Sequence, residues 1–367
     1  MSERILITGG AGFIGRIVGR ELLDRGYEVR VLDSLIEQVH GGGERPEGLD
    51  DMELLVGDIC DASCVRRALA NVDAVIHLAA EVGVGQSMYA ITRYTATNEL
   101  GTATLFEQLL EQPVRRVVTA SSMSIYGEGL YRSADGRLFE DVQRQRTTGG
   151  SWDPVDEEGR PLTPLPTPES KRPALASVYA INKYVQERMT LTLTAAYGME
   201  GVALRLWNVY GPGQALSNPY TGVLAIFASR LASGHSPLVF EDGRQQRDFV
   251  QVRDVARAFA QALEQPAAAG GVFNIASGQP RTIESVARDI GRAMGQEIEP
   301  SITGERRAGD IRHCLADIDL ARSVLDYAPR ENFDKGLAEL ADWVARQSCE
   351  DRVVTAWDEL AVRGLVA

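Results

Sequence analysis

The sequence TGGAGFIG follows directly after a short apolar run near the N-terminus. It spaces Gly9, Gly12 and Gly15 as G-x-x-G-x-x-G, and the residues after it repeat apolar side chains with helical spacing. A strand, a glycine turn and a helix in this order let the backbone approach a pyrophosphate at the helix N-terminus. The feature therefore predicts the first unit of a dinucleotide-binding domain, with Phe13 and Ile14 in the same turn. The alternative is a doubly wound domain with an ordinary tight turn.

Short apolar strands alternate with helices through the first half of the chain. This alternation is typical of parallel sheets that are covered on both faces. We therefore predict an α/β fold, a doubly wound parallel (Rossmann) sheet with a smaller C-terminal α/β domain that binds the substrate. Strands are expected at residues 4–8, 27–33, 52–58, 73–80, 114–122 and 202–207, and helices at 13–26, 62–72, 98–112 and 177–198.

The expected domain boundaries follow the points where this alternation breaks. The cofactor domain is expected at 1–205 with 249–272 returning to it, the substrate domain at 206–248 and 273–345, and a helical tail at 346–367. The tail is amphipathic, so we expect it to serve packing or an oligomer surface.

Residues 128–174 interrupt the pattern. The segment is polar, contains the turn signals ADGRL and EEGRPL, and includes the proline-rich PLTPLPTPESKRP. We interpret it as a surface insertion with one or two hairpins. Whether it is a disordered loop or a flap near the substrate pocket is left open.

Bulk composition excludes several classes of function. The chain has 367 residues, 44% of them hydrophobic and 24% charged, which is typical of a globular protein. Its formal net charge of −13 argues against binding nucleic acid through a basic face. The sequence lacks an apolar run of about eighteen residues and an export signal, so we expect a cytoplasmic protein without a membrane span.

The cysteines indicate a reduced protein without a metal centre. Four cysteines are too few and too scattered for a disulfide framework. Cys60 and Cys64 are either half of a metal site or helix-packing residues. Because no matching His/Cys pair lies nearby, we favour packing and expect no metal.

A carboxylate follows the glycine turn at a spacing that selects the cofactor. Asp33 ends the second expected strand and can bind the adenosine ribose hydroxyls, whereas it would repel a 2′-phosphate. The sequence therefore predicts NAD rather than NADP. Other cofactor contacts are expected at the ends of the third and fourth strands, from Asp58, Ile59, Leu78, Ala79 and Ala80.

Two residues on the helix expected at 177–198 have the spacing of a proton-transfer pair. Tyr179 and Lys183 are four residues apart, so both side chains lie on one helix face. A neighbouring ammonium and the charge of oxidised nicotinamide both favour the phenolate, so tyrosine can act as a general base. A solitary Y-x-x-x-K means little, but here it follows the glycine turn and the serine-bearing strand end SSMSIYG.

These motifs make the chain similar to the extended short-chain dehydrogenase/reductase family, which includes nucleotide-sugar epimerases and dehydratases. The resemblance covers nearly the whole chain through TGGAGFIG, HLAA, TNELGT, SSMSIYG, YAINK, RLWNVYGP, RDFVQVRDVARA, FNIASG and RRAGDI. It implies Ser122 as the catalytic hydroxyl, Tyr179 as the base, and Lys183 as its partner and a ligand of the nicotinamide ribose. It also places Asn98 at the cofactor site, as a support.

The resemblance also implies a nucleotide-diphosphate sugar as the substrate. Two arginines can fork onto a diphosphate that the acidic chain would otherwise repel, although either one alone could be a surface ion pair. The sugar site is expected to include Ser87 and Ser124. The expected ligands of the nucleotide diphosphate are Asn208, Asn218, Arg247 and Arg307, with Asp310 on the ribose.

The positions after the catalytic serine separate the activities of this family. Dehydratases resembling it carry Asp and Glu there, and related decarboxylases keep a Glu, whereas this chain has Met123 and Ser124. Neither side chain can act as a general acid or base in an elimination. We therefore expect an isomerase, a 4-epimerase that works through a 4-keto sugar. A 4-ketoreductase or dehydrogenase with net redox is the alternative, and a non-enzymatic regulator the less favoured one.

The sugar and the nucleotide base are less constrained. The wording around SMSIYGEGLYR and QALSNPYTGVLAIFA resembles dTDP-L-rhamnose 4-epimerases, and other motifs resemble UDP-glucose 4-epimerases. The resemblance makes Cys314 a small residue that leaves room around the sugar C2. Apolar residues on more than one face of the helices at 98–112 and 177–198 favour a homodimer.

Overall fold

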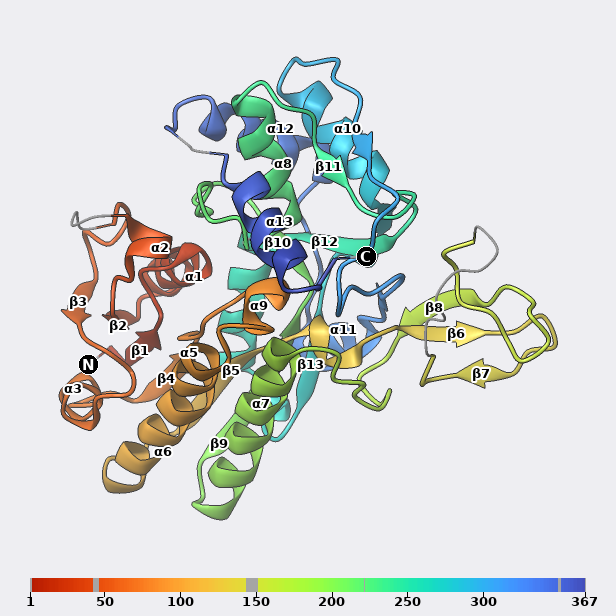
Figure 1. Cartoon of the computed structure of the whole chain (residues 1–367). Coiled ribbons are helices and arrows are strands. Elements are labelled where there is room, and N and C mark those ends of the chain that lie inside the picture. The colour runs from red at the N-terminus through yellow and green to blue at the C-terminus, as the bar shows by residue number, and fades with distance from the viewer. Residues whose placement is uncertain (1, 42–45, 143–150, 221, 349–350, 367) are drawn as a thin grey trace.

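The structure, a computed structural model, describes residues 2–41, 46–142, 151–220, 222–348 and 351–366. Its centre is a parallel seven-stranded sheet in the order β13–β9–β5–β4–β1–β2–β3 (Figure 1). These strands are β1 (Arg4–Thr8), β2 (Glu28–Asp33), β3 (Glu53–Val56), β4 (Ala74–His77), β5 (Arg116–Ser122), β9 (Glu200–Leu206) and β13 (Val272–Ile275). The predicted doubly wound α/β fold is confirmed.

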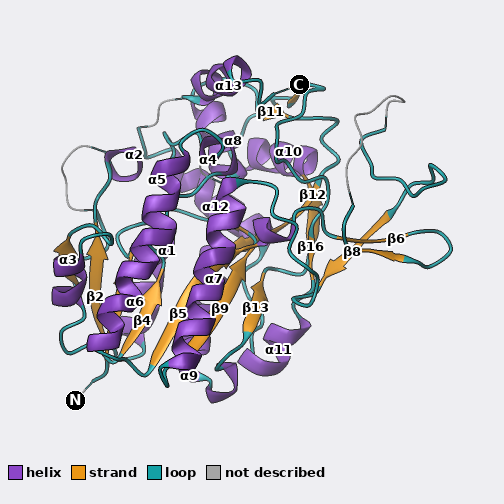
Figure 2. Ribbon diagram, turned by 60° about the horizontal axis from the view of Figure 1, so that its bottom comes forward, coloured by secondary structure: helices purple, strands orange, loops and turns teal. Residues whose placement is uncertain are grey.

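Helices cover both faces of this sheet, as the alternating pattern predicts (Figure 2). They are α1 (Phe13–Asp24) and α9 (Val252–Glu264) on one face, and α3 (Ala62–Ala68), α5 (Ile91–Thr95), the π-helical η1 (Ala96–Leu100), α6 (Gly101–Glu111) and α7 (Val178–Ala196) on the other. Each face has its own apolar core, because strand side chains alternate between the faces. The two cores hold the carboxyl ends of the strands in fixed positions.

A smaller domain lies above these strand ends in Figure 1. Its strands are β10 (Asn208–Tyr210), β11 (Leu238–Val239), β12 (Gln246–Gln251), β14 (Pro280–Thr282) and β15 (Ser301–Ile302), and its helices are α8 (Val223–Ala232), α10 (Ile283–Ala293) and α12 (Phe333–Val344). Helices α8, α10 and α12 contact one another around a third apolar core that includes Phe227, Ile290 and Leu340. Helix α13 (Val353–Val362) follows as the tail.

Two elements lie with the larger domain although the sequence assigned 273–345 to the smaller one. Strand β13 pairs in parallel with β9 at the edge of the large sheet. Helix α11 (Asp319–Leu325) buries Ala321 and Leu325 in the core beneath α1 and α9. Helix α9 packs on α1. Residues 249–272 therefore lie with the larger domain, as expected from the sequence. The chain therefore crosses between the two domains more often than sequence patterns reveal. The other domain boundaries given in the sequence analysis remain predictions.

The insertion forms a small sheet that projects from the body of the protein (Figure 1). Its strands are β6 (Leu130–Arg132), β7 (Leu138–Phe139) and β8 (Thr163–Thr167), and β16 (Leu315–Ala316) joins them in the order β16–β8–β6–β7. The antiparallel pair β6–β7 is a hairpin of the predicted kind. Residues 143–150 of the insertion lie outside the described residues.

A buried arginine ties the insertion to the smaller domain. Arg312 is fully buried, and its guanidinium contacts Asp153 of the insertion at 2.7 Å. It also contacts Glu241 and Asp242 of the smaller domain, each at 3.0 Å. A desolvated guanidinium is tolerated only with such carboxylate partners, so these contacts hold the two segments together.

The described parts of the chain hold neither a membrane-spanning helix nor a metal-binding cluster. In those parts, the helices are all too short or too polar to cross a membrane. Nor do His, Cys, Asp and Glu side chains there gather in a group of three that could hold a metal. Cys60 and Cys64 have different partners. The thiol of Cys60 donates to the carbonyl of Ala96, and the thiol of Cys64 donates to the carboxylate of Asp61. The cytoplasmic location stays a prediction.

Candidate functional site

A cavity of about 660 Å³ lies between the two domains at the carboxyl ends of the large sheet. Parallel α/β sheets place their ligand sites at this edge. The wall of the cavity changes character along its length. One half is formed by the β1–α1 turn and the ends of β2, β3 and β4, and the other by loops of the smaller domain. The described part of the insertion contributes nothing to the wall, so the interpretation as a pocket flap is not supported.

The glycine turn packs so closely against neighbouring backbone that side chains are excluded from it. Gly9 has a φ of +68°, and a Cβ on it would lie 2.7 Å from the amide nitrogen of Ala79. A Cβ on Gly15 would lie 2.5 Å from the Cα of Gly10. Helix α1 then begins at Phe13 without a side-chain cap and without an acidic residue in its first turn. Its amide dipoles are therefore suited to an anion.

Asp33 ends β2 beside this turn. Its carboxylate accepts hydrogen bonds from the amides of Ala11 at 3.0 Å and Leu35 at 2.9 Å, which fix its position at the cavity wall. A carboxylate next to an uncapped helix N-terminus fits the ribose and pyrophosphate of a dinucleotide. The expected cofactor residues that line the cavity are Gly9, Gly12, Phe13, Ile14, Gly15, Asp33, Asp58, Ile59, Leu78, Ala79 and Ala80.

Asn98 lies behind the cavity wall rather than in it. Its carboxamide oxygen accepts from the amide of Glu81 at 2.7 Å, and its nitrogen donates to the carbonyl of Glu81 at 3.0 Å. Both backbone groups after β4 are thereby satisfied by one buried side chain. This arrangement agrees with the supporting role that the resemblance implied and gives Asn98 no direct contact with the cavity.

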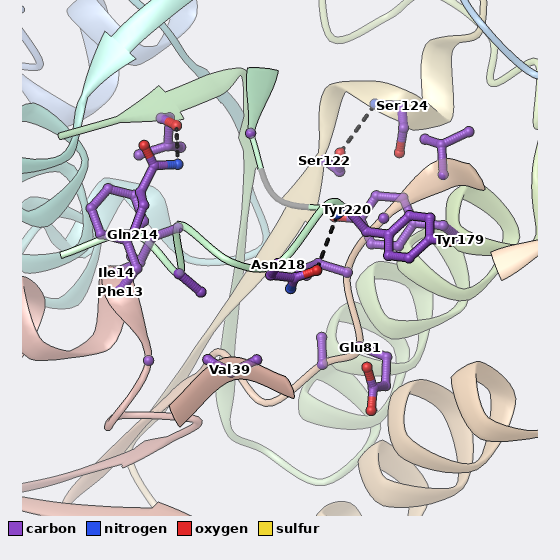
Figure 3. A pocket seen from close by; sticks show the side chains of 18 of the residues that line it. Phe13, Ile14, Val39, Glu81, Ser122, Ser124, Tyr179, Gln214, Asn218 and Tyr220 are labelled. Atoms are coloured by element: carbon purple, nitrogen blue, oxygen red, sulfur yellow. Dashed lines mark hydrogen bonds between the residues drawn. The ribbon is translucent and has the colours of Figure 1, made fainter. Parts of the chain in front are cut away.

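Ser122, Tyr179 and Lys183 all line the middle of the cavity. Ser122 is the last residue of β5, and its hydroxyl accepts from the amide of Ser124 at 3.2 Å, which caps the short helix η2 (Met123–Tyr126). Helix α7 starts at Val178 because Ser177 caps it, accepting from the amide of Ala180 at 3.1 Å. Figure 3 shows Ser122 and Tyr179 at the same side of the pocket.

Burial controls the ionisation of the tyrosine–lysine pair in the protein itself. Desolvation raises the pKa of Tyr179 to about 12, and an interaction with the Ser122 hydroxyl opposes this rise. Desolvation lowers the pKa of Lys183 to about 7, while its Nζ donates to the carbonyl of Ala120 at 3.0 Å. The expected stabilisation of the phenolate by the ammonium is therefore outweighed by burial. A further positive charge, such as oxidised nicotinamide, would lower the pKa of Tyr179.

Several buried polar atoms at the cavity wall lack a hydrogen-bond partner among the described residues. They include the hydroxyl of Ser124 and the carboxamide oxygen of Asn208, and also atoms of Trp207, Gln214 and Gln245. Buried polar groups are nearly always satisfied in complete complexes, so these atoms are suited to bind a ligand. Asn218 also lines the cavity, and its side-chain oxygen accepts from the amide of Tyr220 at 3.1 Å (Figure 3).

The two expected diphosphate arginines line the cavity with protein partners in place. Arg247 donates to the carbonyls of Gln246 and Arg312 at 2.8 and 2.9 Å. Arg307 forms a bidentate pair with Asp310, at 2.9 and 3.2 Å. In the sequence analysis, Arg307 was assigned to the diphosphate and Asp310 to the ribose. In the structure these two side chains contact each other.

Two residues expected near the sugar do not line the cavity. Ser87 is fully buried, and its hydroxyl donates to the carbonyl of Val84 at 2.6 Å and accepts from the amide of Tyr179 at 3.1 Å. Cys314 is also fully buried, and it packs at the start of β16 near Thr167 of the insertion. Ser87 therefore supports helix α7, and Cys314 joins the insertion sheet. Neither position was predictable from its motif.

The acid that the sequence lacks is not supplied by another part of the described chain. The carboxylates of the described residues at the cavity wall are those of Asp33, Asp58, Glu81 and Asp310. Glu81 is held by a bidentate pair with Arg93, with both contacts at 2.7 Å, and Figure 3 shows its carboxylate directed away from Ser122 and Tyr179. The two aspartates of the cofactor half and Asp310 have the hydrogen-bond partners of their own loops.

Sequence reasoning missed one part of the wall completely. The tail contributes Val353, Ala356, Trp357, Leu360 and Val366 to the cavity. Its amphipathic pattern predicts a helix, but a pattern cannot indicate which surface that helix covers. The indole of Trp207 and the phenol of Tyr220 also line the cavity.

Comparisons with known proteins agree with this geometry. A model of the NAD dependent epimerase/dehydratase family matches residues 5–276. A dTDP-L-rhamnose 4-epimerase from Burkholderia thailandensis is 36% identical over 354 residues, or 94% of this chain and 96% of that protein. A dTDP-glucose 4,6-dehydratase from an Actinoplanes species is 31% identical over 352 residues, or 93% of this chain and 97% of that protein.

The solved structures give the same result. UDP-glucose 4-epimerase from Thermotoga maritima, crystallised with UDP-glucose, superposes with a TM-score of 0.76 at 29% identity, covering 94% of this chain and 99% of that one. The predicted family resemblance and the predicted cofactor, NAD, are thus both confirmed. Together with the glycine turn, Asp33 and the Tyr179–Lys183 pair, these matches show that the chain belongs to the NAD dependent epimerase/dehydratase family.

Proposed function

We propose that this protein is a 4-epimerase of a nucleotide-diphosphate hexose. The single observation that carries the proposal is the composition of the site around Ser122. A hydroxyl, a phenol and an ammonium line the cavity there, while the positions after Ser122 are Met123 and Ser124. With NAD as the hydride carrier, such a set suits reversible oxidation of one carbon, whereas it lacks the carboxyl groups after the serine that would protonate a leaving hydroxyl in an elimination.

The proposed reaction uses these side chains in sequence. Tyr179 Oη takes the proton of the sugar 4-hydroxyl, and the hydroxyl of Ser122 donates to the developing 4-keto oxygen. Bound NAD would supply a reversible hydride acceptor for C4, which allows the configuration at that carbon to be inverted. Tyr179 then gives its proton back, so the product differs from the substrate only in configuration at C4. Lys183 holds the nicotinamide ribose and the phenol in register.

The remote nucleotide anchors the sugar during this exchange. Arg247 and Arg307 would bind the diphosphate, with Asn208 and Asn218 beside them. The sugar itself meets few fixed contacts, of which the unpartnered hydroxyl of Ser124 is one. Binding energy from the nucleotide can therefore hold a loosely gripped sugar while it turns over between the two hydride transfers.

A dehydratase is the competing function among the relatives. The Actinoplanes relative carries that name at 31% identity. Elimination needs an acid and a base beside the catalytic hydroxyl, and the described carboxylates of the cavity wall are engaged elsewhere. A ketoreductase or dehydrogenase would use the same residues but exchange its cofactor with solvent.

The nucleotide is proposed to carry thymine or uracil. The dTDP-L-rhamnose 4-epimerase relative, at 36% identity, favours a dTDP-linked sugar. The likeness to a structure with UDP-glucose supports a pyrimidine nucleotide in general.

The test is incubation of the purified protein with a panel of dTDP- and UDP-hexoses without added NAD. Chromatography of the released sugars reports their C4 configuration. We expect conversion of one epimer into a mixture of two, with no change in absorbance at the NADH wavelength. Release of NADH or loss of water from the sugar would overturn the proposal.

We also propose a homodimer through helices α6 and α7, which lie side by side (Figures 1 and 2). Apolar side chains of these two helices and of the preceding η1 are exposed, including Leu100 at 56%, Leu110 at 42% and Ile181 at 42%. Exposed apolar side chains grouped on adjacent helices are typical of a subunit interface. Light scattering on the purified protein would give the mass directly, and a monomer would contradict the proposal.

A further inference from the structure

The C-terminal tail forms one wall of the candidate site, although the proposed function does not use it. Helix α13 belongs to the part of the chain above the large sheet in both views (Figures 1 and 2). Trp357 of this helix is half-buried and lines the cavity. Its indole stacks on the ring of Phe240, with centroids 5.0 Å apart and an interplanar angle of 14°.

A half-buried carboxylate–tyrosine cluster holds the middle of the helix. The carboxylate of Glu359 accepts from the hydroxyl of Tyr89 at 2.5 Å and from that of Tyr220 at 3.1 Å. The two hydroxyls also lie 2.7 Å apart. The guanidinium of Arg363 packs over the ring of Tyr89 at 4.3 Å. These contacts join α13 to two loops of the cavity wall, one from each domain.

Both ends of the tail are held as well. Before the helix, the buried carboxylate of Asp351 contacts Arg230 at 3.0 Å and His235 at 2.8 Å. After the helix, the carbonyl of Leu365 accepts from the amide of Ala308 at 2.8 Å, next to Arg307. A segment fixed at three points has a defined position at the site, so Trp357 is presented to the cavity in one orientation.

The neighbours of Trp357 indicate which part of a ligand it meets. Arg307 and Phe240 are in contact, with the guanidinium 4.4 Å from the ring centroid. Arg247, a residue of β12 in the smaller domain, also lines the cavity. Guanidinium groups suit a diphosphate, and a flat indole beside them suits the flat base attached to that diphosphate.

We propose that Trp357 is a substrate-binding residue and that α13 forms the base-recognising wall of the nucleotide site. The inference rests on the proposed substrate class, a nucleotide-diphosphate sugar. The base packs against the indole that Phe240 supports from behind, and the Glu359 cluster keeps the helix in place. The indole would stack on the face of the base and form no hydrogen bonds with its edge. This wall therefore increases the affinity for thymine and uracil nucleotides alike.

The test measures binding of dTDP and UDP, not turnover, by calorimetry on the NAD-loaded protein. We expect Trp357→Ala to weaken both nucleotides about tenfold, the scale of one aromatic contact, and Trp357→Phe to recover most of that loss. Inorganic pyrophosphate, which has no base, should bind the wild type and Trp357→Ala equally.

Two control variants separate a lost contact from a damaged fold. Val362→Ala changes a side chain on the same helix that is 87% exposed, and Trp343→Phe changes a tryptophan of α12 outside the cavity. Both should leave nucleotide binding unchanged, and all variants should retain their NAD.

The outcomes distinguish this inference from the proposed function. Unchanged dTDP and UDP affinity in Trp357→Ala would overturn the role of Trp357, even if the wild type epimerises a sugar. Equal weakening of pyrophosphate would overturn base recognition and indicate general loosening of the site. If the wild type binds nucleotide through Trp357 but does not epimerise, only the proposed reaction falls.

Discussion

The backbone amide of Tyr179 donates to the hydroxyl of Ser87 at 3.1 Å, which links the loop after β4 to the first turn of α7. The same hydroxyl donates to the carbonyl of Val84 at 2.6 Å. The serine therefore fixes the proposed base through its backbone, without touching the cavity. Its role in the proposed reaction is to position Tyr179.

Ser87→Ala should lower kcat by about threefold to tenfold, because a displaced general base loses alignment with its proton. The KM should change little, since Ser87 contacts no part of the cavity. Steady-state kinetics separates the two quantities. Ser323→Ala is the matched control, since its hydroxyl makes the same contact to the carbonyl three residues earlier, at 3.1 Å, at an exposed position of helix α11. A KM effect larger than the kcat effect would contradict the positioning role.

Tyr179→Phe should lower the rate of epimerisation by about 10²- to 10⁴-fold, the usual contribution of a general base. The phenyl ring keeps the packing, and the glycine turn and Asp33 are unchanged, so NAD should remain bound. Release of NAD on denaturation, measured by chromatography, gives the cofactor content of both proteins. A variant that keeps its full rate would show that Tyr179 is not the base.

Residues at strand ends were predictable because parallel strands have all of their carboxyl ends at one edge of the sheet. This is why Gly9, Asp33 and Ser122, which are far apart in sequence, could be assigned to one site before the structure was known. The tyrosine–lysine pair was predictable for a similar reason, since helical spacing alone puts both side chains on one face.

Positions that depend on contacts between distant segments were not predictable. Ser87 lies only eight residues after Ala79, but its direction is set by packing under α7. Cys314 turned away from the cavity because the next two residues pair with the insertion strand β8. The tail was expected to be a helix, but it is the tertiary contacts of Asp351, Glu359 and Leu365 that bring Trp357 to the cavity.

Gly9→Ala should abolish NAD binding. Its Cβ would lie 2.7 Å from a backbone nitrogen, so the turn must shift and the phosphate cradle is lost. Gly26→Ala is the matched control, because Gly26 also has a positive φ, +86°, but open space around the added Cβ. The control should cost only about 1 kcal/mol of stability and keep its NAD. Equal loss of NAD in both variants would contradict the cradle.

Arg312→Met should destabilise the protein by about 3–5 kcal/mol, because it removes the positive charge that faces three carboxylates in a buried site. Asp153→Asn changes only the more exposed partner, whose side chain is 42% accessible, and should cost about 1 kcal/mol or less. Urea unfolding of both variants measures the difference. Similar costs for the two would show that the cluster is not effectively buried.

Lys183→Met should stabilise the protein while it abolishes activity. Burial lowers the pKa of Lys183 from 10.5 to about 7, so the folded state disfavours the ammonium that the unfolded chain carries. The unfolded state binds more protons between these two values, and stability therefore rises with pH across that window. The penalty is full below about pH 7, shrinks as pH rises and disappears above about 10.5. The gain from Lys183→Met should follow the same course in protein freed of NAD, as measured by urea unfolding at pH 6.5 and pH 9.5. A gain that stays equal at both pH values would show that the lysine keeps its charge in the folded protein.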